Sequence, residues 1–162
     1  IIVPKQEKRK IPTQLDDFAS PTVNTYSLET TIAEKLDAIL DLMEFSSRMK
    51  DYYDIYYLAN KFDFDGATLT KALKKTFENR GHAFTIEQFE QVLTFGNDDA
   101  MQKKWKAFCK KIDTKTDDFN AVLRTIKKFL TEPYKAAVAD IKYTKIWLAN
   151  NNSWIQGGND ND

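Results

Sequence analysis

The sequence predicts an all-α protein built as a multi-helix bundle, with a short N-terminal strand remnant and an extended segment ahead of the helices. Three observations support this fold class. Apolar residues recur at helical spacing in successive segments of the chain. Glycine is scarce, at 5 of 162 residues, and residues that favour helices are common. Hydrophobic residues make up 42% of the chain, which is enough to build a core.

Residues 1–26 are predicted to be extended. The apolar residues 1–3, followed by Pro4, read as the end of a strand, and Pro12 and Pro21 disfavour a helix in the segment that follows. A strand needs partners, and the sequence shows no neighbouring strand here. We therefore expect that something upstream of residues 1–26 is missing.

A helical domain is predicted over residues 27–149. Ser27 is placed to cap its first helix, and Thr85 with Gln88 forms a capping box for the fourth. Short loops between amphipathic helices favour a bundle. The expected helices cover approximately residues 27–45, 48–62, 67–80, 85–96, 98–112 and 117–130, with a short helical piece near 134–141.

The C-terminal part is predicted to be less regular. Pro133 is expected to end the helix that precedes it, because proline lacks the N–H that a helix interior uses. Residues 150–162 are rich in Asn, Gly and Asp, so they are predicted to form a disordered tail.

Composition excludes several classes of protein. The 24 basic residues balance the 24 acidic residues, so net charge gives no argument for binding nucleic acid or a membrane. One cysteine, Cys109, and one histidine, His82, make neither an internal disulfide nor a zinc site. No apolar run approaches the length of a membrane span. We therefore expect a cytoplasmic protein without membrane contact, with His82 in a surface loop and Cys109 facing the core.

Two charged residues fall inside the apolar stripes of consecutive helices. At about 100° per residue, Lys35 lies at about −20° from Leu28, within the apolar face of the first helix. In the second helix Asp51 lies at about 300° from Arg48, again within the apolar face, and Asp54 lies at its border. The helices are joined by about two residues, so they are expected to be antiparallel neighbours. Lys35 and Asp51 can therefore converge.

Two interpretations of this pair are open. An isolated buried charge costs several kcal/mol, so each residue needs a partner or a ligand. In the first interpretation Lys35 and Asp51 form a buried ion pair that holds the two helices together. In the second they line a functional site, where a lysine can hold phosphate and an aspartate can take a proton or orient a metal-bound water.

The residues around this pair resemble a known family. Residues 26–39, with Ala33-Glu34-Lys35, and residues 48–58, with an Arg-x-Lys-Asp-x-x-Asp pattern, resemble the AbiEii/AbiGii family of nucleotidyltransferase toxins. The shorter pieces Phe64-Asp65-Gly66, Thr76-Phe77 and Arg80-Gly81 are also similar to that family. The two motifs together, at this spacing, are fairly specific, and the resemblance is clear over about residues 22–81.

The resemblance implies a function and roles for four residues. The family is similar to nucleotidyltransferases of the polymerase-β type, and its members are toxins of bacterial toxin–antitoxin and abortive-infection systems, some of which transfer nucleotides to tRNA. By this resemblance Asp51 would be catalytic, and Lys35, Arg48 and Asp54 would bind the substrate. Mg²⁺ and a nucleoside triphosphate (NTP) would be the cofactors of a complete member, and an antitoxin protein and tRNA its partners.

The resemblance also implies what this chain lacks. In the family the Mg²⁺-binding carboxylates follow a Gly-Ser turn upstream of the helices, and that motif is absent from this sequence. By this resemblance the sequence corresponds to the C-terminal helical half of such a protein, as a truncated gene product, an isolated domain or a proteolytic fragment, and residues 1–26 are the remnant of the upstream nucleotidyltransferase domain. No metal ligands, no cofactor and no activity are expected for this chain alone. The alternative is a non-catalytic helical module that binds a partner protein.

Overall fold

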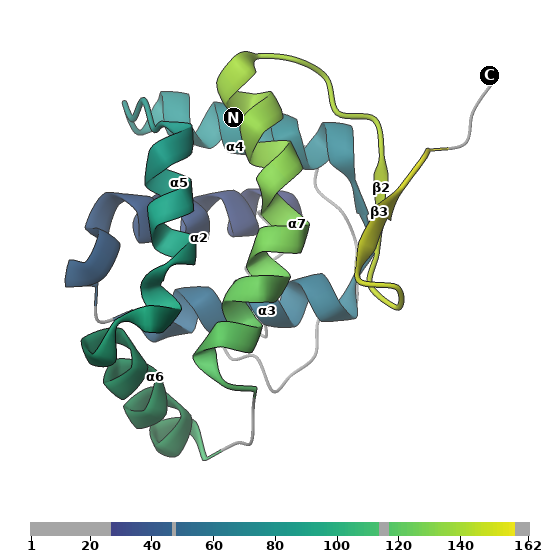
Figure 1. Ribbon diagram of the computed structural model, residues 1–162. Helices are drawn as coiled ribbons and strands as arrows, with labels where there is room; N and C mark the ends of the chain where they lie inside the picture. Colours follow the sequence, from purple (N-terminus) through teal and green to yellow (C-terminus); the bar gives the residue numbers. More distant parts are fainter. Residues whose placement is uncertain (1–26, 47, 114–116, 158–162) are drawn as a thin grey trace.

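The computed structural model describes residues 27–46, 48–113 and 117–157, whose path is shown in Figure 1. Within these residues the chain forms six α-helices and one three-stranded sheet, which confirms the predicted, mainly helical fold class. The helices are α2 (Leu28–Leu42), α3 (Met49–Lys61), α4 (Gly66–Asn79), α5 (Ile86–Leu93), α6 (Asp99–Ile112) and α7 (Phe119–Ala139). The 3-10 helices η2 (Met43–Phe45) and η3 (Phe95–Asn97) follow α2 and α5, and the strands are β1 (Phe64–Asp65), β2 (Ile146–Leu148) and β3 (Ser153–Ile155). The predicted strand remnant and extended segment, residues 1–26, lie outside the described residues.

The predicted helix starts are confirmed by their capping hydrogen bonds. Ser27 Oγ accepts a hydrogen bond from the backbone N–H of Thr30 at 3.1 Å, at the start of α2. At the start of α5 the backbone N–H of Gln88 donates to Thr85 Oγ1 at 3.2 Å, and Gln88 Oε1 accepts from the Thr85 N–H at 2.7 Å. These bonds satisfy N–H groups that have no partner within the helix.

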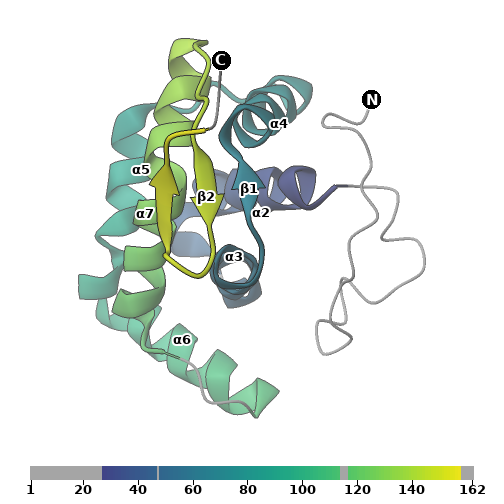
Figure 2. The same ribbon diagram turned by 90° about the vertical axis from the view of Figure 1, so that its right-hand side faces the viewer.

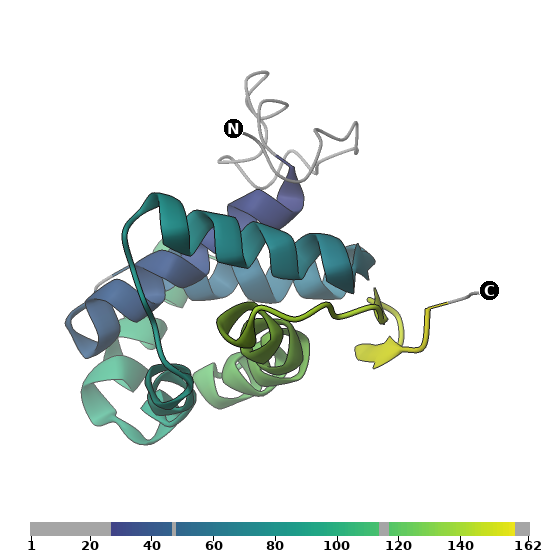
Figure 3. The ribbon, with the colours of Figure 1, turned by 90° about the horizontal axis from the view of Figure 1, so that it is seen from above.

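Two layers of helices enclose the core. The helices α2, α3 and α4 form one layer, and α5 and α7 cross it on one side (Figures 1 and 3). Both α2 and α7 pack against α3, α4 and α5. Fully buried apolar side chains come from both layers, among them Ile32, Leu36, Tyr52, Leu73 and Phe129. Among the described residues no helix is both long and apolar enough to cross a membrane.

The prediction that a helix ends before Pro133 is wrong. The helix α7 runs through Pro133 to Ala139, and Pro133 is buried within it. Proline has no N–H, so the carbonyl of Phe129, four residues earlier, lacks its usual helical donor. The indole N–H of Trp154 donates to this carbonyl at 3.0 Å. A tertiary contact therefore supplies the hydrogen bond that the helix cannot.

The prediction of a disordered tail from residue 150 is wrong for residues 150–157, while residues 158–162 lie outside the described part of the chain. Strands β2 and β3 pair antiparallel, with Trp147 opposite Trp154. Strand β1 joins β2 on its other side with Phe64 opposite Trp147, and Figure 2 shows the three strands on one flank of the helices. The indole N–H of Trp147 donates to the carbonyl of Ala59, near the end of α3, at 2.7 Å. The hairpin is thus attached to two helices by its two tryptophans.

Candidate functional site

The helices α2 and α3 bring together Lys35 and Asp51, the two charged residues that lie on apolar faces. Lys35 lies in the middle of α2 and Asp51 in the first turn of α3. Lys35 Nζ lies 3.6 Å from Asp51 Oδ1 and 2.9 Å from Asp54 Oδ2. The lysine side chain is 14% exposed, while Asp51 and Asp54 are 3% and 0% exposed. The predicted convergence is therefore observed, with Asp54 as the closer partner.

Two further cations, Arg48 and Lys50, join Lys35, Asp51 and Asp54 to form what we call the Lys35 cluster. Arg48 Nε lies 3.2 Å from Asp51 Oδ2, and its Nη2 lies 3.5 Å from Oδ1 of the same carboxylate. Lys50 Nζ donates to both oxygens of Asp54, at 3.1 Å each. Two buried carboxylates are thus held among three cations, which offsets much of the cost of burying them.

The environment of Asp51 disfavours its charged form. Burial raises the pKa of Asp51 above its ordinary value, although the nearby charges of Lys35 and Arg48 act to lower it, and Asp54 adds to the increase. Asp51 Oδ2 is buried and makes no well-aligned hydrogen bond with any described residue. Oδ2 nevertheless has Arg48 Nε at 3.2 Å, so its contact is an ion pair. A carboxylate with a raised pKa is suited to take up a proton.

A pocket, called the Lys35 pocket below, opens beside this cluster. Its volume is about 220 Å³, and Lys35, Arg48 and Arg80 line it together with Asp51 and Glu34. The pocket thus has three cationic and two acidic side chains. Asp54 does not line the pocket, so it contacts Lys35 from the protein interior. Of the four residues that the sequence singled out, three reach the pocket and the fourth supports one of them.

Arg80 and its neighbours were not predicted as site residues. Asp37, in α2, is 1% exposed, and its carboxylate lies 2.9 Å from His82 Nδ1 and 4.0 Å from Arg80 Nη1. His82 Nε2 also lies 3.6 Å from Asp41 Oδ1. His82 lies in the loop between α4 and α5, as expected, with its side chain 28% exposed. Its contacts with Asp37 and Asp41, which the sequence did not predict, join this loop to α2. Arg80-Gly81 among the family-like pieces was the signal in the sequence, but it did not show which residue Arg80 would contact.

The described residues do not fit a Mg²⁺ ion. They contain no group of three or more His, Cys, Asp or Glu side chains placed to hold a metal. The two carboxylates of the cluster, Asp51 and Asp54, already face Lys35, Arg48 and Lys50 within 4 Å. A divalent cation there would have to displace these side chains.

Comparison with known families decides the relationship. The family model described as "Nucleotidyl transferase AbiEii toxin, Type IV TA system" matches residues 1–131. The chain belongs to this family. The AbiEii match covers α2 to α6 and most of α7, so it includes the whole Lys35 pocket and extends beyond the residues whose motifs carried the resemblance. The β2–β3 hairpin lies outside the matched range. No curated protein and no solved structure matches the chain.

Proposed function

We propose that this chain binds the phosphates of an NTP in the Lys35 pocket, as the helical part of an AbiEii nucleotidyltransferase that transfers a nucleotide to an acceptor such as tRNA. The convergence of Lys35, Arg48 and Arg80 on one pocket carries the proposal. Membership of a nucleotidyltransferase toxin family supports it. The cytoplasm, where NTP and tRNA are found, is the proposed compartment, and an antitoxin protein is the proposed partner.

The pocket suits phosphates better than a whole nucleotide. Its volume of about 220 Å³ is smaller than the roughly 300–1,000 Å³ of typical small-molecule sites. Arginine binds phosphate oxygens in a two-pronged geometry, and lysine acts as a compact positive charge. Arg48 precedes the first residue of α3 and Arg80 follows the last residue of α4, and their side chains are 62% and 48% exposed. They can therefore close on a ligand from two sides while Lys35 stays fixed by its buried partners.

Each predicted site residue receives a role in this proposal. In the transfer step the acceptor hydroxyl oxygen bonds to the α-phosphorus, the bond to pyrophosphate breaks, and Asp51 takes the hydroxyl proton. Its raised pKa and its place in the lining of the pocket favour that role. Lys35 and Arg48 stabilise charge on the phosphates, and Asp54 holds Lys35 in position. Mg²⁺ is the expected cofactor of the family's reaction, and its ligands are proposed to lie outside the described residues.

Direct binding measurements test the proposal. ATP, GTP, CTP and UTP are titrated into the isotope-labelled chain, and amide NMR shifts of α2 and α3 report the occupancy of this pocket. Arg48→Gln and Arg80→Gln are each expected to weaken binding there about tenfold, since each removes a charged hydrogen bond of about 1.5–3 kcal/mol.

The matched control is Arg124→Gln on α7, which removes the same group from a residue outside this pocket. It is expected to leave the α2 and α3 response unchanged. If no NTP shifts these amides, or if all three substitutions have the same effect, the proposal is wrong.

A further inference from the structure

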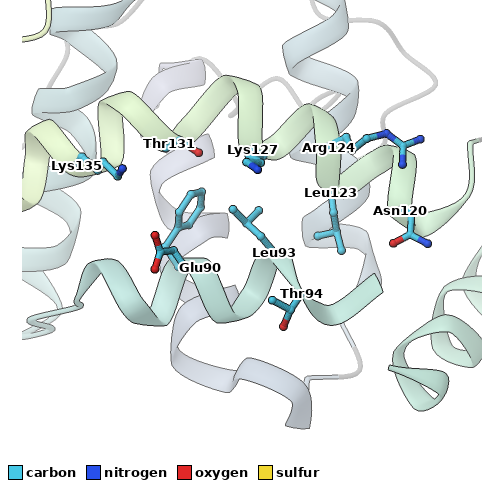
Figure 4. A pocket seen from close by; sticks show the side chains of 10 residues that line it. Glu90, Leu93, Thr94, Asn120, Leu123, Arg124, Lys127, Thr131 and Lys135 are labelled. Atoms are coloured by element: carbon cyan, nitrogen blue, oxygen red, sulfur yellow. The ribbon is translucent and has the colours of Figure 1, made fainter. Parts of the chain in front are cut away.

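A second, larger pocket lies on the other layer of the fold. It has a volume of about 420 Å³ and is formed by α5 and α7. Figure 4 shows Leu93 rising from α5 and Leu123 descending from α7 into the space between the two helices. Phe89 closes the interior, where it stacks on Tyr134 with ring centroids 4.8 Å apart. The floor of this α5–α7 pocket is therefore apolar and partly aromatic.

The two walls of the α5–α7 pocket carry opposite charges. The α7 wall presents Arg124, Lys127 and Lys135, whereas α5 presents the single carboxylate of Glu90 (Figure 4). The spacing of Arg124 and Lys127 places them on one face of α7, about one turn apart. Lys135 follows about 12 Å further along the helix axis, given the rise of about 1.5 Å per residue.

A hydroxyl group without a partner lies between the two ends of the cationic wall. Thr131 lines the pocket, and its Oγ1 is buried with no hydrogen-bond partner among the described residues. In a helix a threonine hydroxyl can bond the preceding turn, but this one makes no such bond. An unsatisfied buried hydroxyl is costly, and a polar ligand in the pocket would satisfy it.

We propose that the α5–α7 pocket binds a nucleoside phosphate whose base carries an amino group. The phosphate lies against Arg124 and Lys127, the ribose hydroxyls meet Thr131, and the base lies on the apolar floor with its N–H donors toward Glu90. Guanine fits best, because its ring N–H and amino group are adjacent and can donate to both oxygens of a carboxylate. Uracil offers one N–H between two carbonyl oxygens, which the Glu90 carboxylate repels.

The mixed charge favours this ligand over an acidic peptide. A peptide rich in carboxylates would be attracted by α7 but repelled by Glu90, whereas a nucleotide carries an anionic end and a donor-bearing end. The pocket volume also falls within the range of small-molecule sites. The lining residues of the α5–α7 pocket and of the Lys35 pocket do not overlap, so this inference goes beyond the proposed function and does not depend on it.

Titration of the isotope-labelled chain with GMP, UMP and a guanosine-ending oligoribonucleotide tests the inference. All titrations use the Arg80→Gln variant, in which binding to the Lys35 pocket is expected to be weakened, and amide shifts of α5 and α7 give the affinity for the α5–α7 pocket. GMP is expected to bind at least tenfold more tightly than UMP, and Glu90→Gln is expected to remove most of this preference. Lys127→Gln is expected to weaken GMP about tenfold, while its neighbour Lys128→Gln, which does not line the pocket, leaves the affinity unchanged.

Thr131→Val keeps the side-chain shape and removes the hydroxyl, so it is expected to leave the fold intact and to weaken GMP severalfold. If the oligoribonucleotide alone binds, with the same dependence on Lys127 and Glu90, the ligand is the end of an RNA and the inference holds. Equal affinity for GMP and UMP, equal effects of Lys127→Gln and Lys128→Gln, or binding only of a Glu-rich peptide would each overturn it.

Discussion

Asp51 and Tyr52 are neighbours in α3, and both bury a polar group at the edge of the core. Asp51 has compensating charges, since Lys35 and Arg48 lie within 4 Å of its carboxylate. The hydroxyl of Tyr52 is buried and has no hydrogen-bond partner among the described residues. By contrast, the hydroxyl of Tyr134, which is equally buried, donates to the carbonyl of Thr85 at 2.6 Å. These differences lead to two predictions for single residues.

Asp51 is expected to make stability depend on pH in the acid range. Its pKa is raised by burial in the folded protein, so between the unfolded value of about 3.9 and the raised value the folded state binds more protons. The free energy of unfolding contributed by Asp51 therefore falls as pH rises through that interval, and is constant above it. Asp51→Asn removes this dependence. The free energy of unfolding of Asp51→Asn, minus that of the original chain, should therefore increase with pH between the unfolded and the raised pKa of Asp51. Urea unfolding at several pH values measures this difference.

Asp99→Asn, at an exposed position in α6, controls for the loss of one carboxyl group from the chain. A difference between Asp51→Asn and the original chain that stays flat across the acid range, or that slopes the other way, would contradict the raised pKa of Asp51.

The two buried tyrosines are expected to respond oppositely to loss of the hydroxyl. Tyr52→Phe removes an unsatisfied buried group and should raise the free energy of unfolding by about 1 kcal/mol. Tyr134→Phe removes the shorter of two hydrogen bonds to the carbonyl of Thr85, the other coming from the backbone N–H of Phe89 at 3.4 Å, and should lower the free energy of unfolding by about 1 kcal/mol. Urea midpoints of both variants, measured side by side, check the pair. If both substitutions destabilise to the same extent, the Tyr52 hydroxyl has a partner in solution.

At the scale of elements, the hairpin completes the hydrogen bonding of two helices. Trp147 donates to the carbonyl of Ala59 at the end of α3, and Trp154 donates to the carbonyl that Pro133 leaves unpaired in α7. Gly66 lets the hairpin approach, because a Cβ there would lie 2.5 Å from the carbonyl oxygen of Lys145. The short sheet therefore depends on the helices for its position, and α7 depends on the sheet for one hydrogen bond.

Trp154 and Pro133 are expected to be energetically coupled. Trp154→Phe leaves the Phe129 carbonyl unsatisfied and removes packing, so it should lower the free energy of unfolding by about 2 kcal/mol. Pro133→Ala restores an N–H that can donate to the same carbonyl. Trp154→Phe should then cost about 1 kcal/mol less in the Pro133→Ala background than in the original chain. A double-mutant cycle by urea unfolding measures the coupling, and strictly additive effects would refute it.

At the scale of the whole molecule, the Lys35 cluster joins α2 to α3. Lys35 Nζ lies 3.6 Å from Asp51 Oδ1, so the structure contains the Lys35–Asp51 ion pair of the first interpretation. It also contains a closer ion pair, at 2.9 Å, with the buried Asp54. Lys35 also lines the pocket on which the second interpretation depends. One lysine is thus placed to support the fold and, in the proposed function, to bind the ligand.

Lys35→Met is expected to destabilise the protein. The substitution keeps the volume of the side chain but leaves Asp51 with Arg48 alone and Asp54 with Lys50 alone, so we expect a loss of about 3 kcal/mol in the free energy of unfolding. Adding Asp54→Leu should recover part of that loss, because it removes the carboxylate closest to the missing ammonium group. Urea melts at neutral pH give both values. An unchanged or raised midpoint for Lys35→Met would show that the cluster does not stabilise the fold.

The sequence alone determined the features that depend on neighbouring residues. Helical spacing identified α2 to α6 and most of α7, and side-chain caps such as Ser27 marked where helices begin. The same spacing placed Lys35 and Asp51 on core-facing stripes, from which their meeting followed. These features can be predicted because side-chain direction in a helix repeats about every 3.6 residues, so a short stretch of sequence shows the whole pattern.

The tertiary structure alone decided the features that join distant residues. Pro133 is an acceptable helix residue only because Trp154 reaches Phe129 across 25 positions, and the hairpin is held by Trp147 bonding Ala59 across 88. Asp37 in α2 contacts both Arg80 and His82, and Arg80 lines the pocket with residues of α2. Asp54, and not Asp51, is the closer partner of Lys35. Such contacts stabilise features that are unfavourable locally, such as a missing N–H or a buried charge, through a partner far along the chain. The local sequence does not identify that partner.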